Sequence, residues 1–258
     1  MQDSRVALVT AGASGIGRAI AECLAADGVT VHICDRDQSS LDQCLDDNPN
    51  MRGSCCDVSD IGQVDSLFAD LAGYTERLDI LVNNVGIAGP TAPVEDLDPM
   101  DWDRTIAVDL NSAFYVTRLA TPLLKQSRGS IVNMASNAAL FGFPLRSPYA
   151  AAKWALIGLT KTWAMEMGPS GVSVNAICPG SVNGPRIESV IAKDAGERGL
   201  QAEEIRDVYL RQSSMRVFVE ATDIAETVKF LCSPAGHNIS GQALGIDGHT
   251  EGLSNWLD

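Results

Sequence analysis

Short apolar runs alternate with longer segments of helical periodicity along almost the whole chain, and this alternation constrains the fold more than any other feature. Runs of strand length lie at residues 6–10, 29–34, 53–56, 80–83, 130–135, 172–178 and 242–246. Helices are predicted between them at residues 15–27, 38–46, 61–73, 100–126, 148–168 and 221–232. Strands that alternate with helices pair in parallel through right-handed crossovers. The sequence therefore predicts an α/β fold over residues 1–258, a single domain with a doubly wound parallel sheet of about seven strands and helices on both faces.

A turn of small residues follows the first predicted strand and reads Ala11-Gly12-Ala13-Ser14-Gly15-Ile16-Gly17. Glycines let the backbone approach a pyrophosphate, and the start of the following helix offers free N–H groups and a positive dipole end. The second strand leads into Asp35, and an acidic residue about 20 positions past the glycines is placed to bind ribose hydroxyls. The pattern predicts a dinucleotide site of the Rossmann type, with a plain tight turn as the alternative.

A phenol and an ammonium are predicted side by side at the start of a later helix. Ser147 is a good N-cap, and Pro148 suits the first helical position. Tyr149 and Lys153 are four residues apart and therefore share one helix face. A nearby cation favours the phenolate form, which makes Tyr149 a candidate general acid/base for an alcohol or carbonyl. Taken alone, the pair is also compatible with an ordinary solvated surface contact.

Several polar or small residues lie just past predicted strands. Because the carboxyl ends of parallel strands meet at one edge of the sheet, these residues are expected to form one site. They are Gly12, Asp35, Asp57, Asn84, Ser136 and Pro179.

Together these motifs resemble the short-chain dehydrogenase/reductase family over nearly the whole chain. Residues 10–17 resemble its Thr-Gly-x-x-x-Gly-x-Gly motif, and Tyr149 with Lys153 matches its Tyr-x-x-x-Lys motif. Further matches are Asp57-Val58, Asn83-Asn84-Val85-Gly86, Asn111 in Val108-Asp109-Leu110-Asn111, Ser136 thirteen residues before the tyrosine, and Pro179-Gly180.

The resemblance implies an oxidoreductase that interconverts a secondary alcohol and a ketone. It assigns catalysis to Asn111, Ser136, Tyr149 and Lys153. It implies a nicotinamide dinucleotide as cofactor and no metal. The cofactor contacts that it implies are Gly12, Ser14, Gly15, Ile16, Gly17, Asp35, Arg36, Asp57, Val58, Asn84, Gly86, Tyr149, Lys153, Pro179, Gly180 and Val182. A dinucleotide-sensing regulator, or a lyase or epimerase on the same scaffold, remains an alternative.

The choice of cofactor depends on the end of the second strand. Asp35 would repel the extra phosphate of NADP, whereas Arg36 could bind it, and NAD is favoured. Three positions depart from the family pattern. Ala11 stands where the family has a glycine, Gly184 where it often has a threonine, and His249 where it usually has a glycine.

Composition excludes several other classes. The net charge of -14 argues against nucleic acid and anionic membranes as partners. No apolar run approaches the length of a membrane helix. The first strand begins close to Met1, which leaves no room for a signal peptide, and the seven cysteines have no metal-site spacing. The expectation is a cytoplasmic protein with reduced thiols.

Residues 181–219 break the alternation and are expected to form a lid over a small-molecule substrate. Arg146 and Arg186 fall near the expected substrate pocket, and a guanidinium suits a carboxylate or similar anion. A small polar or acidic substrate is therefore expected. The alternative is a salt bridge to the acids of the same stretch, Glu188 among them, or plain solvent exposure. The resemblance implies a homotetramer, because members of the family commonly bury the helices at 100–126 and 148–168 against copies of themselves. The helix at 148–168 is apolar on more than one face, which agrees with that expectation.

Overall fold

One parallel sheet of seven strands organises the computed structural model, which describes residues 5–253. The strands run in the order β3-β2-β1-β4-β5-β6-β7, so the chain builds one half outward from β1 and then returns past it. Every neighbouring pair is parallel. The strands are β1 Val6–Thr10, β2 Thr30–Asp35, β3 Arg52–Cys55, β4 Ile80–Asn83, β5 Ser130–Met134, β6 Ser173–Pro179 and β7 Ala243–Ile246. The predicted doubly wound fold is confirmed.

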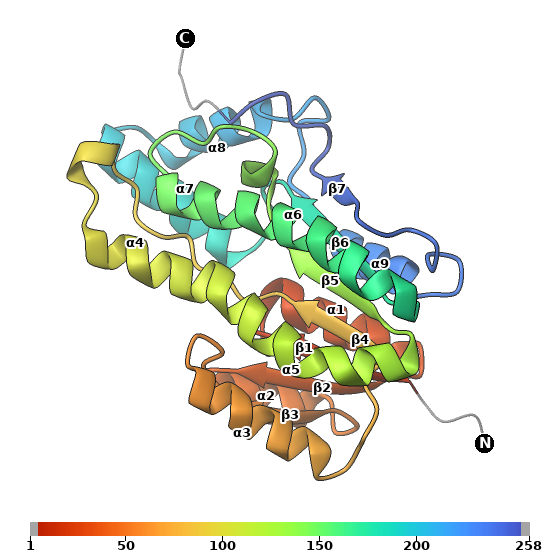
Figure 1. The fold of residues 1–258 in the computed structure, drawn as a ribbon. Coiled ribbons are helices and arrows are strands. Elements are labelled where there is room, and N and C mark those ends of the chain that lie inside the picture. The colour runs from red at the N-terminus through yellow and green to blue at the C-terminus, as the bar shows by residue number, and fades with distance from the viewer. Residues whose placement is uncertain (1–4, 254–258) are drawn as a thin grey trace.

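Helices cover both faces of this sheet, and Figure 1 shows α5 and α6 crossing in front of it. The α-helices are α1 Gly15–Ala26, α2 Gln38–Asp47, α3 Ile61–Ala72, α4 Pro99–Ile106, α5 Ser112–Ser127, α6 Ser147–Met167, α7 Pro185–Arg198, α8 Ala202–Arg211 and α9 Ala221–Leu231. Three short 3-10 turns lie at Val94–Asp96, Asn137–Ala139 and Gly168–Ser170.

The two faces of the sheet bury separate hydrophobic clusters, because successive side chains of a strand point to opposite sides. On β1, Ala7 and Val9 belong to the cluster that α1, α2 and α9 cover. Val6 and Leu8 belong to the cluster that α3, α5 and α6 cover. A strand buried on both faces must be apolar throughout, which explains the continuous apolar runs in the sequence.

The long helix predicted at residues 100–126 is divided in two. A π-helical turn, Ala107–Asn111, separates α4 from α5, and the N–H of Ser112 bonds the carbonyl of Ala107 five residues back. The wider turn coincides with an inward-pointing Asp109, whose carboxylate bonds the backbone of the segment after β4. Such turns concentrate at functional sites.

Helix α6 begins one residue earlier than predicted. Arg146 occupies the N-cap position without a side-chain cap, and Ser147 is the first helical residue. The prediction that Ser147 caps this helix is therefore wrong. Pro148 lies in the first turn, where backbone N–H groups have no partner within the helix, so the proline costs no helical hydrogen bond. Tyr149 therefore still shares one helix face with Lys153.

The stretch at residues 181–219 contains two helices, α7 and α8, which pack on each other through a small cluster of their own. Ile187, Ile191, Ile205 and Tyr209 belong to that cluster. The stretch follows β6 directly and therefore lies at the carboxyl edge of the sheet (Figure 1). A parallel bridge between Val182 and Val219 closes its base.

Candidate active site

A cavity of about 540 Å³ opens at the carboxyl ends of β1, β4, β5 and β6. Its wall is formed by the turn after β1, the segments after β4 and β5, the start of α6, and the stretch that leads from β6 into α7. Ligands of open parallel sheets bind at this edge.

Two glycines of the turn after β1, Gly12 and Gly17, are required by close packing. A Cβ atom on Gly12 would lie 2.6 Å from Cγ2 of Ile33, and one on Gly17 would lie 2.0 Å from the carbonyl oxygen of Ala11. Gly15 has a φ of 53°, and a Cβ atom there would meet nothing within 4 Å. Gly15 also lines the cavity together with Ser14 and Ile16. This open backbone surface at the start of α1 fits the pyrophosphate of a dinucleotide.

Ala11 adopts the left-handed conformation that glycine would normally supply, with a φ of 49°. Asn84 holds this turn in place. Its side-chain amide donates to the carbonyl oxygens of Thr10 at 3.2 Å and Ala11 at 3.1 Å. These two hydrogen bonds keep the turn in its strained conformation, although Ala11 carries a methyl group that a glycine would lack.

Asp35 ends β2 beside the same turn. Its Oδ2 accepts from the N–H of Ala13 at 3.3 Å, and its Oδ1 accepts from the N–H of Asp37 at 3.1 Å. The side chain is half-buried, while Arg36 next to it is exposed. The carboxylate is fixed at the sheet edge and retains lone pairs for further donors.

Two of the predicted cofactor residues, Asp57 and Val58, follow β3. Asp57 accepts the N–H and hydroxyl of Ser59 through Oδ1, and Val58 is buried in the cluster that α3 covers. Asp35, Arg36, Asp57 and Val58 do not line the 540 Å³ cavity. They extend the same sheet edge from the cavity towards β3.

Three of the four predicted catalytic residues line the cavity together: Ser136, Tyr149 and Lys153. Lys153 is 3% exposed, and its Nζ donates to the carbonyl oxygen of Met134 at 3.1 Å. The same Nζ lies 5.7 Å from the ring centroid of Tyr149. A desolvated ammonium and a phenol therefore share one wall of the cavity.

The hydroxyl of Ser136 is engaged with its own neighbours. It donates to Oδ1 of Asn137 at 3.2 Å and accepts from the N–H of Ala138 at 3.2 Å. Asn137 in turn donates to Oγ1 of Thr250 at 3.2 Å and also lines the cavity, which sequence reasoning missed. A hydroxyl can rotate its proton towards another acceptor, so Ser136 remains able to donate into the cavity.

Asn111 is half-buried in the π-helical turn and does not line the cavity. This turn packs against α6, the helix that carries Tyr149 and Lys153. The fourth predicted catalytic residue therefore lies on an element adjoining the other three.

Asp109 is a site residue that sequence reasoning missed. Its side chain is buried, its Oδ1 accepts from the N–H of Ile87 at 2.7 Å, and its Oδ2 lies 3.8 Å from Nζ of Lys153. Burial raises the pKa of the Asp109 carboxyl, although Lys153 opposes that effect. The signal in the sequence was a charged residue in an otherwise apolar helical run, two positions before Asn111.

The two arginines predicted to bind substrate both line the cavity but differ in their contacts. Arg146 donates to the carbonyl oxygen of Ala88 at 2.9 Å. Arg186 is exposed, and in the described residues its guanidinium makes no hydrogen bond or ion pair, since Glu188 pairs with Arg206 instead. The predicted alternative of a salt bridge from Arg186 to Glu188 is therefore wrong, whereas the alternative of plain solvent exposure agrees with the exposed position of Arg186.

The segment after β6 carries the remaining predicted cofactor residues. Pro179, Gly180 and Val182 line the cavity. A Cβ atom on Gly180 would lie 2.9 Å from Cβ of Asp247, so only glycine fits. Gly184, with a φ of 138°, precedes α7. Gly86 packs closely against Lys153, because a Cβ atom on Gly86 would lie 3.1 Å from Nζ of Lys153.

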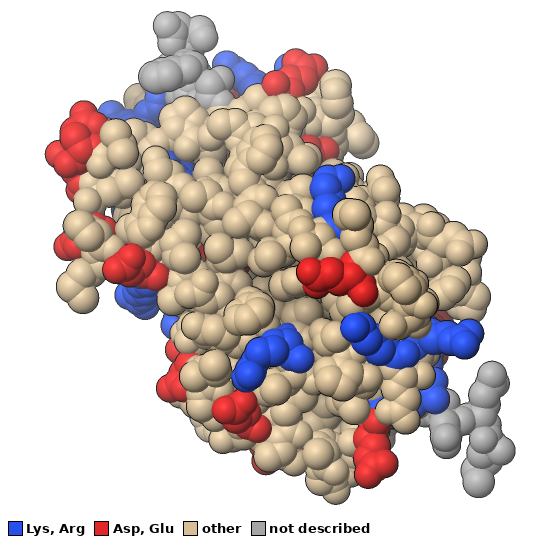
Figure 2. Space-filling view, viewed as in Figure 1, with Lys and Arg blue, Asp and Glu red and all other residues tan. Residues whose placement is uncertain are grey.

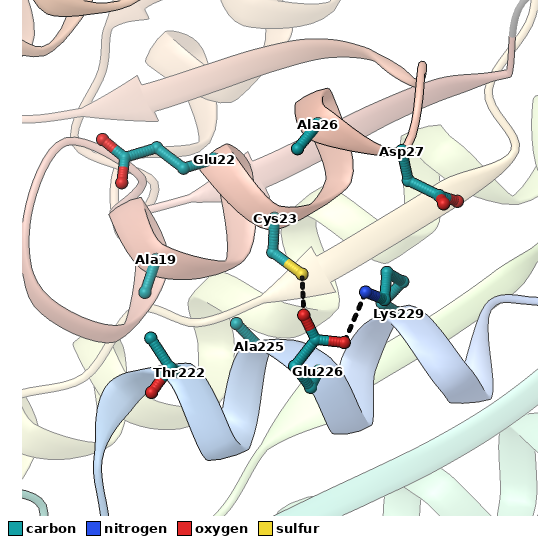
Figure 3. Close-up of a pocket in the computed structure, with 9 residues that line it drawn as sticks. All are labelled: Ala19, Glu22, Cys23, Ala26, Asp27, Thr222, Ala225, Glu226 and Lys229. Atoms are coloured by element: carbon teal, nitrogen blue, oxygen red, sulfur yellow. Dashed lines mark hydrogen bonds and ion pairs between the residues drawn. The ribbon is translucent and has the colours of Figure 1, made fainter.

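A second cavity of about 320 Å³ lies between α1 and α9 and is shown in Figure 3. Cys23 donates to Oε1 of Glu226 at 3.4 Å, and the other oxygen of that carboxylate pairs with Lys229. Burial raises the pKa of the Cys23 thiol, which therefore stays neutral. A neutral thiol beside an already paired carboxylate offers no nucleophile, and in the described residues no group of side chains forms a metal site.

Comparison with known proteins agrees with the geometry of the larger cavity. The family model described as enoyl-(acyl carrier protein) reductase matches residues 10–250. The 3-oxoacyl-[acyl-carrier-protein] reductase of Thermotoga maritima is 33% identical over 251 residues, which cover 95% of this chain and 97% of that protein. The chain belongs to the short-chain dehydrogenase/reductase family.

Two solved structures of this family superpose closely. A variant of actinorhodin polyketide ketoreductase with NADPH gives a TM-score of 0.91 at 32% identity and covers 99% of each chain. An NAD⁺-bound xylitol dehydrogenase gives 0.89 at 27% identity and covers 95% of this chain and 99% of that one. Short-chain dehydrogenases/reductases are oxidoreductases that act on alcohols and ketones in small molecules with a nicotinamide dinucleotide, and the glycine turn described above fits that cofactor. Among the described residues, none of the helices is long and apolar enough to cross a membrane.

Proposed function

We propose that this chain is an NAD-dependent oxidoreductase that interconverts a secondary alcohol and a ketone in a small, polar or acidic substrate. The observation that carries the proposal is the position of Ser136, Tyr149 and Lys153 on one cavity that also includes the glycine turn. A phenol, an ammonium and a hydroxyl around one space suit a substrate oxygen that gains or loses a proton.

Each residue is assigned a different role at the substrate oxygen. Tyr149 takes the proton of the alcohol during oxidation and returns it during reduction. Ser136 turns its hydroxyl from Asn137 towards the substrate and stabilises charge on the oxygen. Lys153 holds a positive charge near the phenol and favours the phenolate. Asn111 supports the link from Lys153 to solvent, and the bound dinucleotide supplies the hydride chemistry.

NAD is proposed over NADP because of Asp35. Its carboxylate is fixed at the end of β2, accepts hydrogen bonds from ribose hydroxyls and repels the additional phosphate of NADP. Arg36 argues in the other direction, as does the NADPH of the ketoreductase relative. The proposed cofactor contacts are the residues of the glycine turn, Asp35, Arg36, Asp57, Val58, Asn84, Gly86, Tyr149, Lys153, Pro179, Gly180 and Val182.

The substrate is proposed to carry a carboxylate or comparable polar group because Arg186 lines the cavity and, in the described residues, forms no ion pair or hydrogen bond, Glu188 being paired with Arg206. Arg146 already donates to Ala88, so it contributes less. We expect Arg186→Ala to raise KM about 10-fold or more for an anionic substrate, the cost of one charged hydrogen bond. KM for neutral alcohols should stay within twofold. An equal change for both classes would exclude the anion contact.

The experiment that tests the proposed function is a substrate panel. Purified protein is mixed with NAD and sugars, polyols, hydroxy acids or steroid alcohols, and NADH absorbance is followed. Net NADH formation is expected with a small polar or acidic alcohol. Dinucleotide binding without turnover on any alcohol or ketone would indicate the regulator, and product formation without net NADH would indicate the lyase or epimerase.

A homotetramer is proposed from the outer surface of α5 and α6. Figure 2 shows that the face over these helices carries few charges. Met165 is 81% exposed, and Trp154 and Phe114 are about half exposed on the same two helices. Large apolar side chains gathered on one face are typical of an interface.

We also propose that residues 1–258 act as one domain, that residues 181–219 form the lid, and that the protein is cytoplasmic.

A further inference from the structure

We propose that the substrate carries a hydroxyl group on the carbon next to the reacting carbon, and that Asn137 recognises it. This inference rests on the proposed function and narrows its substrate class to vicinal diols and the hydroxy ketones formed from them. Asn137 lies outside the four predicted catalytic residues and lines the same cavity as Ser136 and Tyr149. The deciding feature is one buried amide oxygen, Oδ1 of Asn137.

The side-chain amide of Asn137 is engaged at both ends, and the residue is 8% exposed. Nδ2 donates to Oγ1 of Thr250 at 3.2 Å, and Oδ1 accepts from the hydroxyl of Ser136 at 3.2 Å. Within residues 5–253, Ser136 is the hydrogen-bond donor that this oxygen has. The amide oxygen therefore depends on the same proton that Ser136 gives to the substrate in the proposed mechanism.

Thr250 anchors the nitrogen end of this amide. The N–H of Thr250 donates to Oδ2 of Asp247 at 3.2 Å, and Thr250 forms an antiparallel bridge with Ser213 in the loop after α8. Thr250 is itself buried. The amide nitrogen of Asn137 is thus held against the C-terminal segment, and the amide oxygen stays beside Ser136.

The hydroxyl of Ser136 cannot serve Asn137 and the substrate at once. Its oxygen accepts from the N–H of Ala138 at 3.2 Å, and it has one proton to donate. When that proton turns to the reacting oxygen, Oδ1 of Asn137 loses its donor. A buried acceptor without a donor is costly. A substrate hydroxyl that donates to Oδ1 removes this cost, whereas a substrate without one leaves it in place.

The spacing of the two protein oxygens selects the position of that hydroxyl. Oγ of Ser136 and Oδ1 of Asn137 are 3.2 Å apart. Oxygens on neighbouring carbons lie within hydrogen-bond distance of each other in the gauche conformation, so one can accept from Ser136 while the other donates to Asn137. Oxygens on more distant carbons meet this spacing only in folded conformations, which cost conformational freedom. A carboxylate in that position has no proton to donate and does not replace the hydroxyl.

The test compares three alcohols with one carbon skeleton: vicinal butanediol, its monomethyl ether and sec-butanol, each as all of its stereoisomers. The ether keeps the second oxygen but cannot donate, and sec-butanol lacks that oxygen. We expect kcat/KM for NADH formation to be about 10- to 100-fold higher for the diol than for the other two, the scale of leaving a buried acceptor without a partner. Vicinal dihydroxybutanoate and β-hydroxybutanoate repeat the comparison for substrates with a carboxylate.

Asn137→Leu is the matched variant, because it keeps the approximate shape of the side chain and removes the amide. The diol should then lose its advantage, with its kcat/KM within about threefold of that for sec-butanol. The kcat/KM for sec-butanol should not fall, since Ser136 no longer gives its proton to Asn137. A merely structural Asn137 would lower kcat/KM for every alcohol alike. Thr250→Val should also reduce the preference for the diol, because the amide nitrogen loses its acceptor.

The control for Thr250→Val is Thr160→Val. Thr160 is also a buried threonine that accepts from an asparagine amide, Nδ2 of Asn133 at 2.9 Å, but neither of these two residues lines the cavity. Thr160→Val should lower the melting temperature, as the loss of a buried hydrogen bond does, and leave the preference for the diol unchanged.

Three results would overturn the proposal. The first is a parent protein that oxidises the ether or sec-butanol as well as the diol, and the second is an Asn137→Leu variant with the parent's preference. The third is a best alcohol in the wider substrate panel that has no neighbouring hydroxyl. Failure of the proposed function is distinguishable, because the parent would then form no NADH with any alcohol, whereas failure of this inference removes the preference and leaves NADH formation intact.

Discussion

Replacing Asp35 with serine tests the proposed cofactor preference. In the parent, the Asp35 carboxylate is fixed by the N–H groups of Ala13 and Asp37 at the end of β2. Asp35→Ser removes a charged acceptor for the ribose hydroxyls of NAD. It also removes a negative charge from the region where NADP carries its additional phosphate.

The magnitude follows from these two effects. A hydrogen bond to a charged group contributes about 1.5–3 kcal/mol. Like charges about 4 Å apart repel by about 1 kcal/mol in a water-like dielectric and by about 4 kcal/mol at an effective dielectric constant of about 20. Because Asp35 is half-buried, the low ends are used. Their sum, about 2.5 kcal/mol, predicts that the ratio of kcat/KM for NAD to that for NADP falls roughly 60-fold.

The assay measures kcat/KM with both dinucleotides at one saturating alcohol concentration. Asp37→Ser is the control, because it removes an exposed carboxylate two residues further on, and the ratio should then change by less than about twofold. An unchanged ratio in Asp35→Ser would show that Asp35 does not contact the ribose. An equal change in both variants would show that only net charge matters.

Two further predictions concern stability and assembly. His32 is buried between Tyr74 and Ser54, and burial lowers its pKa to about 4. Stability should therefore be lost as pH falls from about 6.5 to 4, by about 3 kcal/mol. Urea unfolding at both pH values should show that loss in the parent and not in His32→Gln, and equal losses would contradict it. Met165→Glu should convert the tetramer to smaller species in light scattering, while Met215→Glu, at an exposed position on the loop after α8, should not. A monomeric parent at micromolar concentration would refute the interface.

The fold was predictable from the sequence because the signals for it are local. Apolar runs and the glycine turn predicted all seven strands to within one or two residues at each end. Gly12 and Gly17 are glycines for steric reasons that hold wherever a strand, a turn and a helix pack this closely. Residues placed at the carboxyl ends of strands necessarily share one edge, so most of the candidate site followed from the order of the elements.

What could not be predicted depends on contacts between distant segments. The break between α4 and α5 is a π-helical turn whose Asp109 bonds Ile87, 22 residues away in the sequence. A π-helical turn adds only one residue to a helix, and hydrophobic periodicity in the sequence does not reveal so small a change. The hydrogen bond from Arg146 to Ala88 and the pairing of Glu188 on α7 with Arg206 on α8 likewise depend on how separate segments pack, which no local pattern encodes.

The central claim is that Tyr149 exchanges the proton of the reacting oxygen. The most direct test is single-turnover NADH formation by Tyr149→Phe with the best alcohol of the substrate panel, alongside dinucleotide binding measured by fluorescence. The account predicts that the rate falls by about 10²–10⁴-fold, the scale of general acid/base catalysis, while the dissociation constant for NAD stays within about threefold. A rate within about threefold of the parent, with NAD bound normally, would contradict the account.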